Sequence, residues 1–238
     1  VIEVEEAMAG GAPLVHSFAE RNICFQTELV KGNVEKAFDE ADEIFEDNFE
    51  FPMIYHYSME PHTSIAQFDS DGITIWASTG HPFGVRQEVA EVFKVPLSKV
   101  RVHTNFVGAA YGSKSGAKIE PLVVALARKA QRPVRVVQTF SEAMVTCRRH
   151  GIKCKINPGV KKDGTLVAKQ AEIFLNTGAY AETGPTVSRR TLTRILGPYR
   201  YPNLKINSYC IYTHTPSAAS FRSIGGPQTA WATESQMD

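Results

Sequence analysis

Residues 100–140 read VRVHTNFVGAAYGSKSGAKIEPLVVALARKAQRPVRVVQTF. The pattern over residues 100–107 predicts a strand, and residues 133–140 predict another. Between them, residues 119–131 form a largely apolar segment that predicts a helix. A strand, a helix and a second strand in this order predict a parallel crossover unit, in which both strands run the same way in one sheet.

A run of small residues, GAAYGSKSG at 108–116, separates the first of these strands from the helix. Small side chains let a backbone approach a ligand closely, and the start of a helix presents free N–H groups to an anion. The run also nearly matches a nucleotide-binding P-loop, although Ser113 stands where that motif requires its second glycine. A ligand loop, a plain tight turn and a P-loop nucleotide site all stay open at this point.

The chain before this stretch alternates between strand and helix patterns. It predicts, in order, a strand (1–4), a connector (5–20), a helix capped by Asn33, a strand (44–51), a hairpin that turns at Asp71-Gly72 (65–79) and a helix (81–95). The last helix presents one apolar face, formed by Val85, Val89, Val92 and Phe93.

The chain after residue 140 has a larger strand content. It predicts a second hairpin (154–160 and 166–176, around KKDGT), a strand (204–213) and a final helix that follows the loop FRSIGGPQ (221–228), with Pro227 near its first turn. Taken together, the patterns indicate an α+β fold with mixed sheets and packed helices.

The composition gives no electrostatic reason to expect nucleic acid or a membrane surface as a partner. Lys plus Arg number 26 and Asp plus Glu number 25, for a net charge of +1. No apolar run approaches the ~20 residues of a transmembrane helix. The four cysteines form no metal-binding spacing, which favours free buried thiols in a reducing, cytoplasmic compartment. Both ends of the sequence look cut, because VIEVEE opens within an apparent strand and the last residues lie within an apparent helix.

Three short motifs have both a functional and a structural interpretation. Arg222 in FRSIGGPQ could bind an anionic oxygen, or it could lie on a surface loop. Glu60 and His62 could form a catalytic pair, but a buried glutamate that caps backbone N–H groups at a turn is the favoured interpretation. The cluster RRH (148–150) most simply marks an exposed or ion-paired helix end.

Nine segments, in order and with matching spacing, resemble the molybdopterin-binding subunit of the xanthine dehydrogenase and aldehyde oxidase family over roughly residues 20–238. They are MEPHTSIAQFD (59–69), STGHPFGVRQEVAEVFKVPLSKVRV (78–102), VGAAYGSK (107–114), RPVRVVQTFSEAM (132–144), RRH (148–150), NTGAYAETG (176–184), GPYRYPN (197–203), FRSIGGPQ (221–228) and ESQMD (234–238).

The resemblance implies a domain layout and a chemistry. Residues 1–20 would be the tail of a preceding domain and a connector, and residues 21–238 the first half of a molybdenum-cofactor-binding domain that is truncated at its C-terminus. Members of the family hydroxylate an N-heterocycle or an aldehyde with water as the oxygen source. They use a molybdenum–molybdopterin cofactor, or its dinucleotide form, while iron–sulfur clusters and FAD on partner domains or subunits carry the electrons away.

The resemblance also assigns residues. The cofactor would be bound by Gly80, Gly108, Ala109, Ala110, Tyr111, Gly112 and Arg222. Gly80 stands where the family usually has a glutamine. Ala109 and Ala110 replace two glycines of the family's glycine-rich loop, and their side chains would crowd a cofactor that approaches the loop closely. Either the loop takes an ordinary conformation or the pocket has changed.

The substrate pocket would include Ser115, Arg190 and Ile224. Ser115 and Ile224 replace a glutamate and an aromatic residue that bind purines in some members, which argues against xanthine itself as the substrate. The general-base glutamate of the family is expected downstream, so the chain contains no catalytic residue or protein metal ligand and is expected to be inactive alone. Its expected partners are the remaining half of the domain, iron–sulfur and flavin domains or subunits, and a small-molecule substrate. The alternative is a non-catalytic binding or assembly protein that kept the fold and lost the cofactor.

Overall fold

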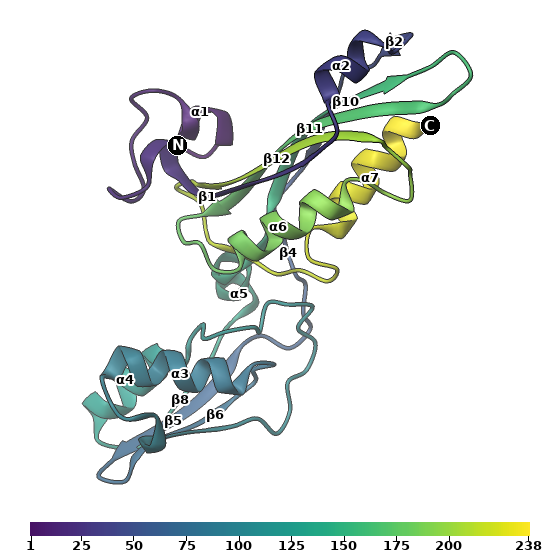
Figure 1. The fold of residues 1–238 in the computed structure, drawn as a ribbon. Coiled ribbons are helices and arrows are strands. Elements are labelled where there is room, and N and C mark those ends of the chain that lie inside the picture. Colours follow the sequence, from purple (N-terminus) through teal and green to yellow (C-terminus); the bar gives the residue numbers. More distant parts are fainter. The chain divides into compact units, whose positions relative to one another are not determined.

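The computed structural model describes residues 1–238, which form two compact units. The larger unit consists of residues 1–54 and 148–238, and the smaller unit of residues 55–147. Figure 1 shows the chain leaving the larger unit near β4 (Ile54–Tyr55), building the smaller unit, and then returning. Each unit has a sheet and a hydrophobic core of its own.

A mixed sheet is the centre of the larger unit. Its strands lie in the order β1 (Ile23–Lys31), β12 (Asn203–Tyr212), β11 (Leu166–Gly178), β10 (Gly151–Val160) and β2 (Glu43–Ile44), and β3 (Asp47–Phe51) also pairs with β10. Only β11 and β12 pair in parallel, and helix α6 (Gly184–Arg194) joins them. A parallel pair cannot be joined by a tight turn, so the crossover helix follows from the pairing.

The two faces of this sheet are covered by different helices. Helices α6 and α7 (Gly226–Met237) pack on one face, where Val187, Ile195 and Ala232 meet Ile173 and Ile206 of the sheet (Figure 1). Helix α1 (Val4–Met8) packs against Ile211, whose side chain points to the other face because side chains alternate along a strand.

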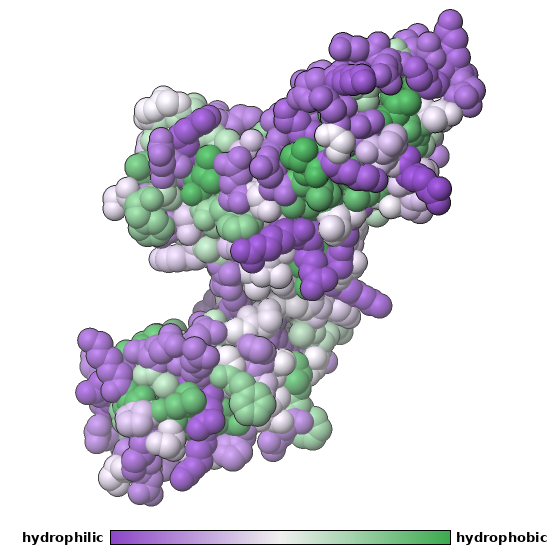
Figure 2. Space-filling model, in the orientation of Figure 1, coloured by the Kyte–Doolittle hydropathy of each residue, from purple (hydrophilic) through white to green (hydrophobic).

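The remaining elements of the larger unit are short. They are the 3-10 turn η1 (Glu20–Asn22), helix α2 (Val34–Asp39), and strands β9 (Arg148–Arg149) and β13 (Ala218–Ala219), which pair in parallel. The side chain of Asn33 accepts a hydrogen bond from the Lys36 N–H and so caps α2. Figure 2 shows mainly hydrophilic side chains over α2 and the tip of the β10–β11 hairpin, where the turn KKDGT lies.

The smaller unit is a four-stranded sheet in the order β7 (Val100–His103), β6 (Gly72–Ala77), β5 (Thr63–Asp69) and β8 (Val134–Val137). Helices α3 (Pro82–Phe93) and α4 (Glu120–Ala130) cover one face, and their apolar side chains meet Ile73 and Ile75. The opposite face carries the stacked rings of Trp76 and His103. The unit also contains η2 (Leu97–Lys99) and α5 (Phe140–Thr146).

Most predicted elements are confirmed. The structure contains the Asn33-capped helix, both hairpins, the helices at 81–95, 119–131 and after 226, and the strand at 204–213, each with bounds shifted by a few residues. The predicted strand at 44–51 is present as two short strands. All four cysteines are free thiols, and three of them are buried while Cys24 is half-buried. None of the helices combines the length and apolar character that a membrane crossing requires.

Three predictions were wrong. Residues 1–4 form no strand, because Val4 begins a helix that buries Val4 and Ala7. Val92 is 61% exposed and lies off the buried face of α3. The cluster at 148–150 begins a strand instead of ending a helix, and Arg149 and His150 are buried.

The predicted parallel crossover is confirmed, because β7 and β8 lie in one sheet and run in the same direction. Strands β7 and β8 belong to one sheet, but they lie at its opposite edges, with the β5–β6 hairpin between them. The adjacent parallel pair is β6 and β7, and α3 joins it. The two predicted strands are therefore parallel members of one sheet without being neighbours in it.

Candidate functional site

The loop between β7 and α4 has an unusual backbone. Gly108, Tyr111, Gly112 and Gly116 all have positive φ, with +53° at Tyr111. A tyrosine in the left-handed region is strained, and such strain persists only where the surroundings enforce it. Ala109 is not among the residues with positive φ, and neither is Ala110, so both alanines take ordinary conformations. The two alanines therefore need no glycine-like backbone, although the loop that contains them does not have an ordinary conformation.

Glu60 holds the first half of the loop. Its Oε2 accepts a hydrogen bond of 2.8 Å from the Ala109 N–H. A Cβ added at Gly108 would lie 2.8 Å from the Glu60 side chain, and φ there is +67°. Glycine is therefore required at 108 for two reasons. The capping interpretation of Glu60 is confirmed, although the side chain is exposed instead of buried.

Lys114 closes the loop from inside. Its side chain is only 2% exposed, and Nζ donates a hydrogen bond of 2.5 Å to the Val107 carbonyl. Burial lowers the pKa of the Lys114 ammonium, and the negative charge of Glu60 opposes this shift. A P-loop lysine must instead reach the phosphates of a bound nucleotide. The P-loop interpretation was therefore wrong, since this lysine points into the protein.

The carbonyl of Lys114 joins the loop to the end of β6. It accepts a hydrogen bond of 2.9 Å from the Gly80 N–H and one of 3.2 Å from the Thr79 hydroxyl. A Cβ added at Gly80 would meet only this carbonyl, at an ordinary 3.7 Å. Gly80 thus contributes its backbone, and the space beside it can accept a side chain.

His62 supports the second half of the loop. Its ring is buried, and Nε2 lies 3.1 Å from the Ser113 carbonyl. Burial lowers the pKa of His62, so the ring is neutral at pH 7 and Nε2 carries the proton that it donates. A buried, neutral histidine bonded to a carbonyl is a support for the loop, and it does not form a catalytic pair with Glu60.

These supports leave part of the loop backbone free. The N–H groups of Ser113 and Ser115 donate to the carbonyls of Ala110 and Gly112. The N–H groups of Ala110, Tyr111 and Gly112 donate to no group of the protein. Consecutive backbone N–H groups in such a turn form a concavity that suits an anion or an electron-rich oxygen. The loop can therefore bind a ligand through its main chain.

The helix that follows does not contribute an anion site. Helix α4 begins at Glu120, several residues after the loop. The buried Glu120 carboxylate accepts a hydrogen bond of 2.7 Å from the Lys118 N–H, so the start of the helix is already capped by its own side chain. The expectation that the helix start would meet a ligand at this loop was wrong.

The other residues predicted for the site are divided between the two units. Ser115 is in the loop, where its hydroxyl donates to the Gly112 carbonyl at 2.6 Å. Arg222 is exposed on a turn of the larger unit. In the same turn, Ile224 packs against the core, while Arg190 is exposed on α6. The structure brings Gly80 together with residues 107–115, and it leaves the roles of the other three as predictions.

Sequence reasoning missed the contacts that hold the loop. Three side chains hold the loop through hydrogen bonds to its carbonyl groups, and the sequence did not assign them to a cofactor site. They are those of Thr79, His62 and Lys114. A lysine within a run of small residues was the one available signal, because a long cation there must either face a ligand or fold inward. Nothing in the sequence distinguishes these two outcomes.

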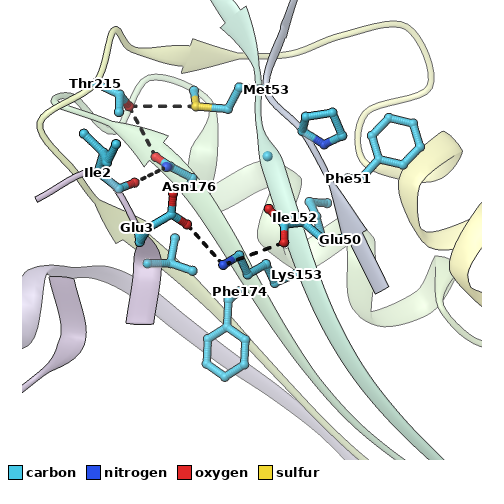
Figure 3. A pocket seen from close by; sticks show the side chains of 13 residues that line it. Ile2, Glu3, Glu50, Phe51, Met53, Ile152, Lys153, Phe174, Asn176 and Thr215 are labelled. Carbon is cyan, nitrogen blue, oxygen red and sulfur yellow. Dashed lines mark hydrogen bonds and ion pairs between the residues drawn. The ribbon is translucent and has the colours of Figure 1, made fainter. Parts of the chain in front are cut away.

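A separate cavity of about 240 Å³ lies in the larger unit. Figure 3 shows Phe51, Met53 and Ile152 on its wall, with Lys153 as its one cation. Lys153 Nζ lies 3.1 Å from Glu3 and 3.0 Å from Glu5. The cation is thus already neutralised by carboxylates, and the cavity has no free charge for an anionic ligand.

A second cavity, of about 590 Å³, lies on the open face of the smaller unit's sheet, beside Trp76 and His103. It is mainly apolar and has no group that could act as an acid or base other than His103. The loop therefore remains the best candidate for a functional site.

Comparison with known proteins points to one family. Residues 15–238 match the family model described as the molybdopterin cofactor-binding domain. The chain is 34% identical over 239 residues to the xanthine dehydrogenase molybdenum-binding subunit of Escherichia coli O157:H7, covering 98% of this chain and 31% of that protein. It is 32% identical over 240 residues to the nicotinate dehydrogenase large molybdopterin subunit of Eubacterium barkeri, covering 100% of this chain and 56% of that protein.

Solved structures support the fold. The aldehyde oxidoreductase from Desulfovibrio gigas matches 100% of this chain with a TM-score of 0.94 at 24% identity. The match covers 26% of that protein. The chain therefore spans only part of the proteins that it resembles, between about a quarter and about a half of their length.

Proposed function

The chain belongs to the molybdopterin cofactor-binding domain family, and on that premise we propose that residues 107–115 and Gly80 form part of the binding site for a molybdenum–molybdopterin cofactor. The observation that carries this proposal is the set of unpaired N–H groups at Ala110, Tyr111 and Gly112. They lie on a loop that Glu60 and the buried Lys114 hold in a strained shape. A loop built in this way is preorganised to donate hydrogen bonds.

The chemistry of the loop residues fits such a cofactor. The free donors are main-chain N–H groups, which suits a cofactor whose metal is held by its own pterin dithiolene. Tyr111 is 45% exposed, so its ring is available to cover a bound group. The cofactor, when bound, supplies the redox-active metal that allows a substrate carbon to be hydroxylated with oxygen from water.

The role of this chain is to bind and orient. The free N–H groups hold the cofactor, and the open space beside Gly80 leaves room for the reacting end of a substrate. Arg222 is proposed as a further contact to an anionic oxygen, on the basis of the family motif that it occupies. The general base is expected outside residues 1–238, so these residues position the reactants and transfer no proton themselves.

We propose an N-heterocycle or an aldehyde as the substrate of the whole protein. Curated relatives are named for xanthine and nicotinate, which are both N-heterocycles. Ser115 and Ile224 differ from the purine-binding pattern, which favours a heterocycle other than xanthine. The proposed partners are the remaining half of the cofactor domain and iron–sulfur and flavin domains or subunits, and the cytoplasm is the proposed compartment.

Expression of the full-length protein with its partner subunits tests this function. We expect about one molybdenum per chain by mass spectrometry of the metal content, and hydroxylation of N-heterocycles or aldehydes with oxygen from labelled water. A properly folded protein that holds no molybdenum would contradict the proposal. It would favour the non-catalytic alternative, a binding or assembly protein that kept only the fold.

A further inference from the structure

Two cysteines meet across the larger sheet at an irregularity in strand pairing. Ile23 of β1 pairs with Ile211 of β12, but the next paired residues are Phe25 and Cys210, so Cys24 is left over. In such a β-bulge, two residues of one strand oppose a single residue of its partner. The bulge directs Cys24 toward Cys210, and their Sγ atoms lie 3.6 Å apart.

The two thiols differ in access to solvent. Cys210 is fully buried, whereas Cys24 is half-buried. A hydrogen bond from the Cys210 thiol to the Cys24 thiolate, helped by the Tyr212 hydroxyl, lowers the pKa of Cys24. The same contact raises the pKa of Cys210. The hydrogen bond therefore favours the thiolate form of Cys24, the more exposed residue of the two, and the thiolate is the reactive form of cysteine.

The start of helix α6 lies against the same pair. A Cβ added at Gly184, the first residue of α6, would lie 2.6 Å from the Cys210 sulfur and 2.6 Å from the Thr177 hydroxyl. The positive end of the helix dipole favours a negative charge nearby. The helix start therefore lies directly against Cys210, the buried member of the pair.

We propose that Cys24 and Cys210 form a peroxide-reactive pair, in which Cys24 is oxidised first and Cys210 then closes a disulfide between β1 and β12. In the first step, the Cys24 thiolate attacks hydrogen peroxide, the O–O bond breaks, and Cys24 sulfenic acid and hydroxide form. In the second step, the Cys210 sulfur displaces the hydroxyl group as water. The pair loses two electrons to the peroxide, and the net products are one disulfide and two water molecules.

The second step needs movement of the two cysteine side chains only. The sulfurs must close from 3.6 Å to about 2 Å, which small side-chain rotations can supply without a change in strand pairing. Cys154 provides a matched control in the same sheet. It is 3% exposed, and burial raises its pKa to about 12, so it is expected to stay inert.

The experiment treats the reduced full-length protein with hydrogen peroxide, blocks the remaining thiols and maps the peptides by mass spectrometry. We expect a peptide pair joined through Cys24 and Cys210, lighter by two hydrogen atoms and separated by dithiothreitol. In the untreated protein, we expect an alkylating reagent to label Cys24 roughly tenfold or more faster than Cys154.

Two variants separate the steps. In Cys210→Ser, Cys24 is expected to stop at the sulfenic acid, which dimedone traps, and in Cys24→Ser, Cys210 is expected to stay reduced. Cys154→Ser should form the Cys24–Cys210 link as the unmodified protein does. The proposal is overturned if Cys24 and Cys210 stay reduced under conditions that oxidise Cys154, or if Cys24 joins a different cysteine. Because the mapping of the unmodified protein gives this answer directly, a variant that fails to fold does not block the test.

Discussion

The hydrogen bond between Glu60 and Ala109 determines where the candidate loop begins. The Glu60 carboxylate accepts from the Ala109 N–H at 2.8 Å. We expect Glu60→Ala to free this amide and to raise hydrogen exchange in residues 104–116 by roughly fivefold to tenfold, which corresponds to a net hydrogen bond of about 1 kcal/mol. Glu60→Gln keeps an acceptor at the same reach and should restore most of the protection. Unchanged exchange in Glu60→Ala would show that the loop shape does not depend on this bond.

Gly108 permits a sharper test, because the chain contains a matched glycine. Both Gly108 and Gly164 have positive φ, +67° and +86°, but only Gly108 lies against another side chain. We expect Gly108→Ala in the full-length protein to displace Glu60 and lower the molybdenum content several-fold. Gly164→Ala carries the same backbone strain, on the order of 1 kcal/mol, and should leave the molybdenum content unchanged. An equal loss in both variants would assign the effect to general instability.

Gly80 is a position where a side chain can be added without a clash. The nearest atom to a new Cβ is the Lys114 carbonyl oxygen at 3.7 Å, and φ is not in the left-handed region. We therefore expect Gly80→Gln to change the melting temperature by no more than about 2 °C, as for a substitution that meets no strain. If the space beside Gly80 belongs to the substrate, the same variant should raise KM for bulky heterocycles more than for small aldehydes. A large loss of stability would contradict the geometry of this site.

At the scale of elements, local patterns identified the segments that bury apolar side chains at regular spacing. The hairpins and helices α3 and α4 were predicted because their buried faces are formed by residues such as Val85, Val89, Val123 and Val124. Helix α6 was not predicted, since part of its buried face is polar. Ser188 bonds to Ser208 at 2.8 Å, and Thr191 lies 3.2 Å from the same hydroxyl. A helix that buries hydroxyl groups against a partner strand contains few apolar residues from which an apolar stripe could be recognised.

Neighbour relations could not be predicted either. The sequence predicted two strands with a helix between them, but pairing depends on contacts between distant segments. The β5–β6 hairpin occupies the centre of the smaller sheet and separates β7 from β8. In the candidate site, the small residues of the loop were recognisable, whereas the residues that support it from behind, His62 and Thr79, are brought there only by the fold.

Strand β11 contains a buried cation, Lys169, that bonds to the chain at the end of helix α6 and should give a measurable pH dependence of stability. Lys169 Nζ donates to the Ile195 carbonyl at 2.7 Å, and burial lowers the pKa of Lys169 to about 8. Between this value and the ordinary 10.5, the unfolded chain binds more protons than the folded one. The free energy of unfolding therefore rises with pH across this window, by up to about 3 kcal/mol from this group.

The comparison with Lys169→Met isolates this contribution. We expect the difference in unfolding free energy between the unmodified protein and the variant to shift in favour of the unmodified protein from pH 8 to pH 10.5. Urea unfolding at several pH values measures it, and the tyrosine and cysteine groups that do not interact with Lys169 cancel because both proteins contain them. Parallel pH profiles would mean that Lys169 has an ordinary pKa in the folded protein.

At the scale of the whole molecule, the smaller unit is a continuous insertion into the larger one. The chain enters it at Tyr55 and leaves it at Cys147, and both residues are buried. The two ends lie close together, since β4 (Ile54–Tyr55) pairs with β9 (Arg148–Arg149). An insertion with adjacent ends and its own core is expected to fold independently of the segments that flank it.

We therefore expect residues 55–147, expressed alone, to give a mixed helix and strand signal by circular dichroism and a single cooperative unfolding transition. Val123 is fully buried in the core of this unit, so Val123→Asp should abolish the transition, while a change at the exposed Lys129 should not.

The same fragment tests whether the candidate loop takes its shape within the smaller unit. The contacts that hold the loop, from Glu60, His62, Thr79 and Lys114, lie within residues 55–147. The isolated unit should accordingly protect the Ala109 amide from hydrogen exchange as the full-length protein does. A folded fragment in which this amide exchanges freely would mean that the loop takes its shape from outside the unit, and the candidate site would then have to be sought in the assembled protein.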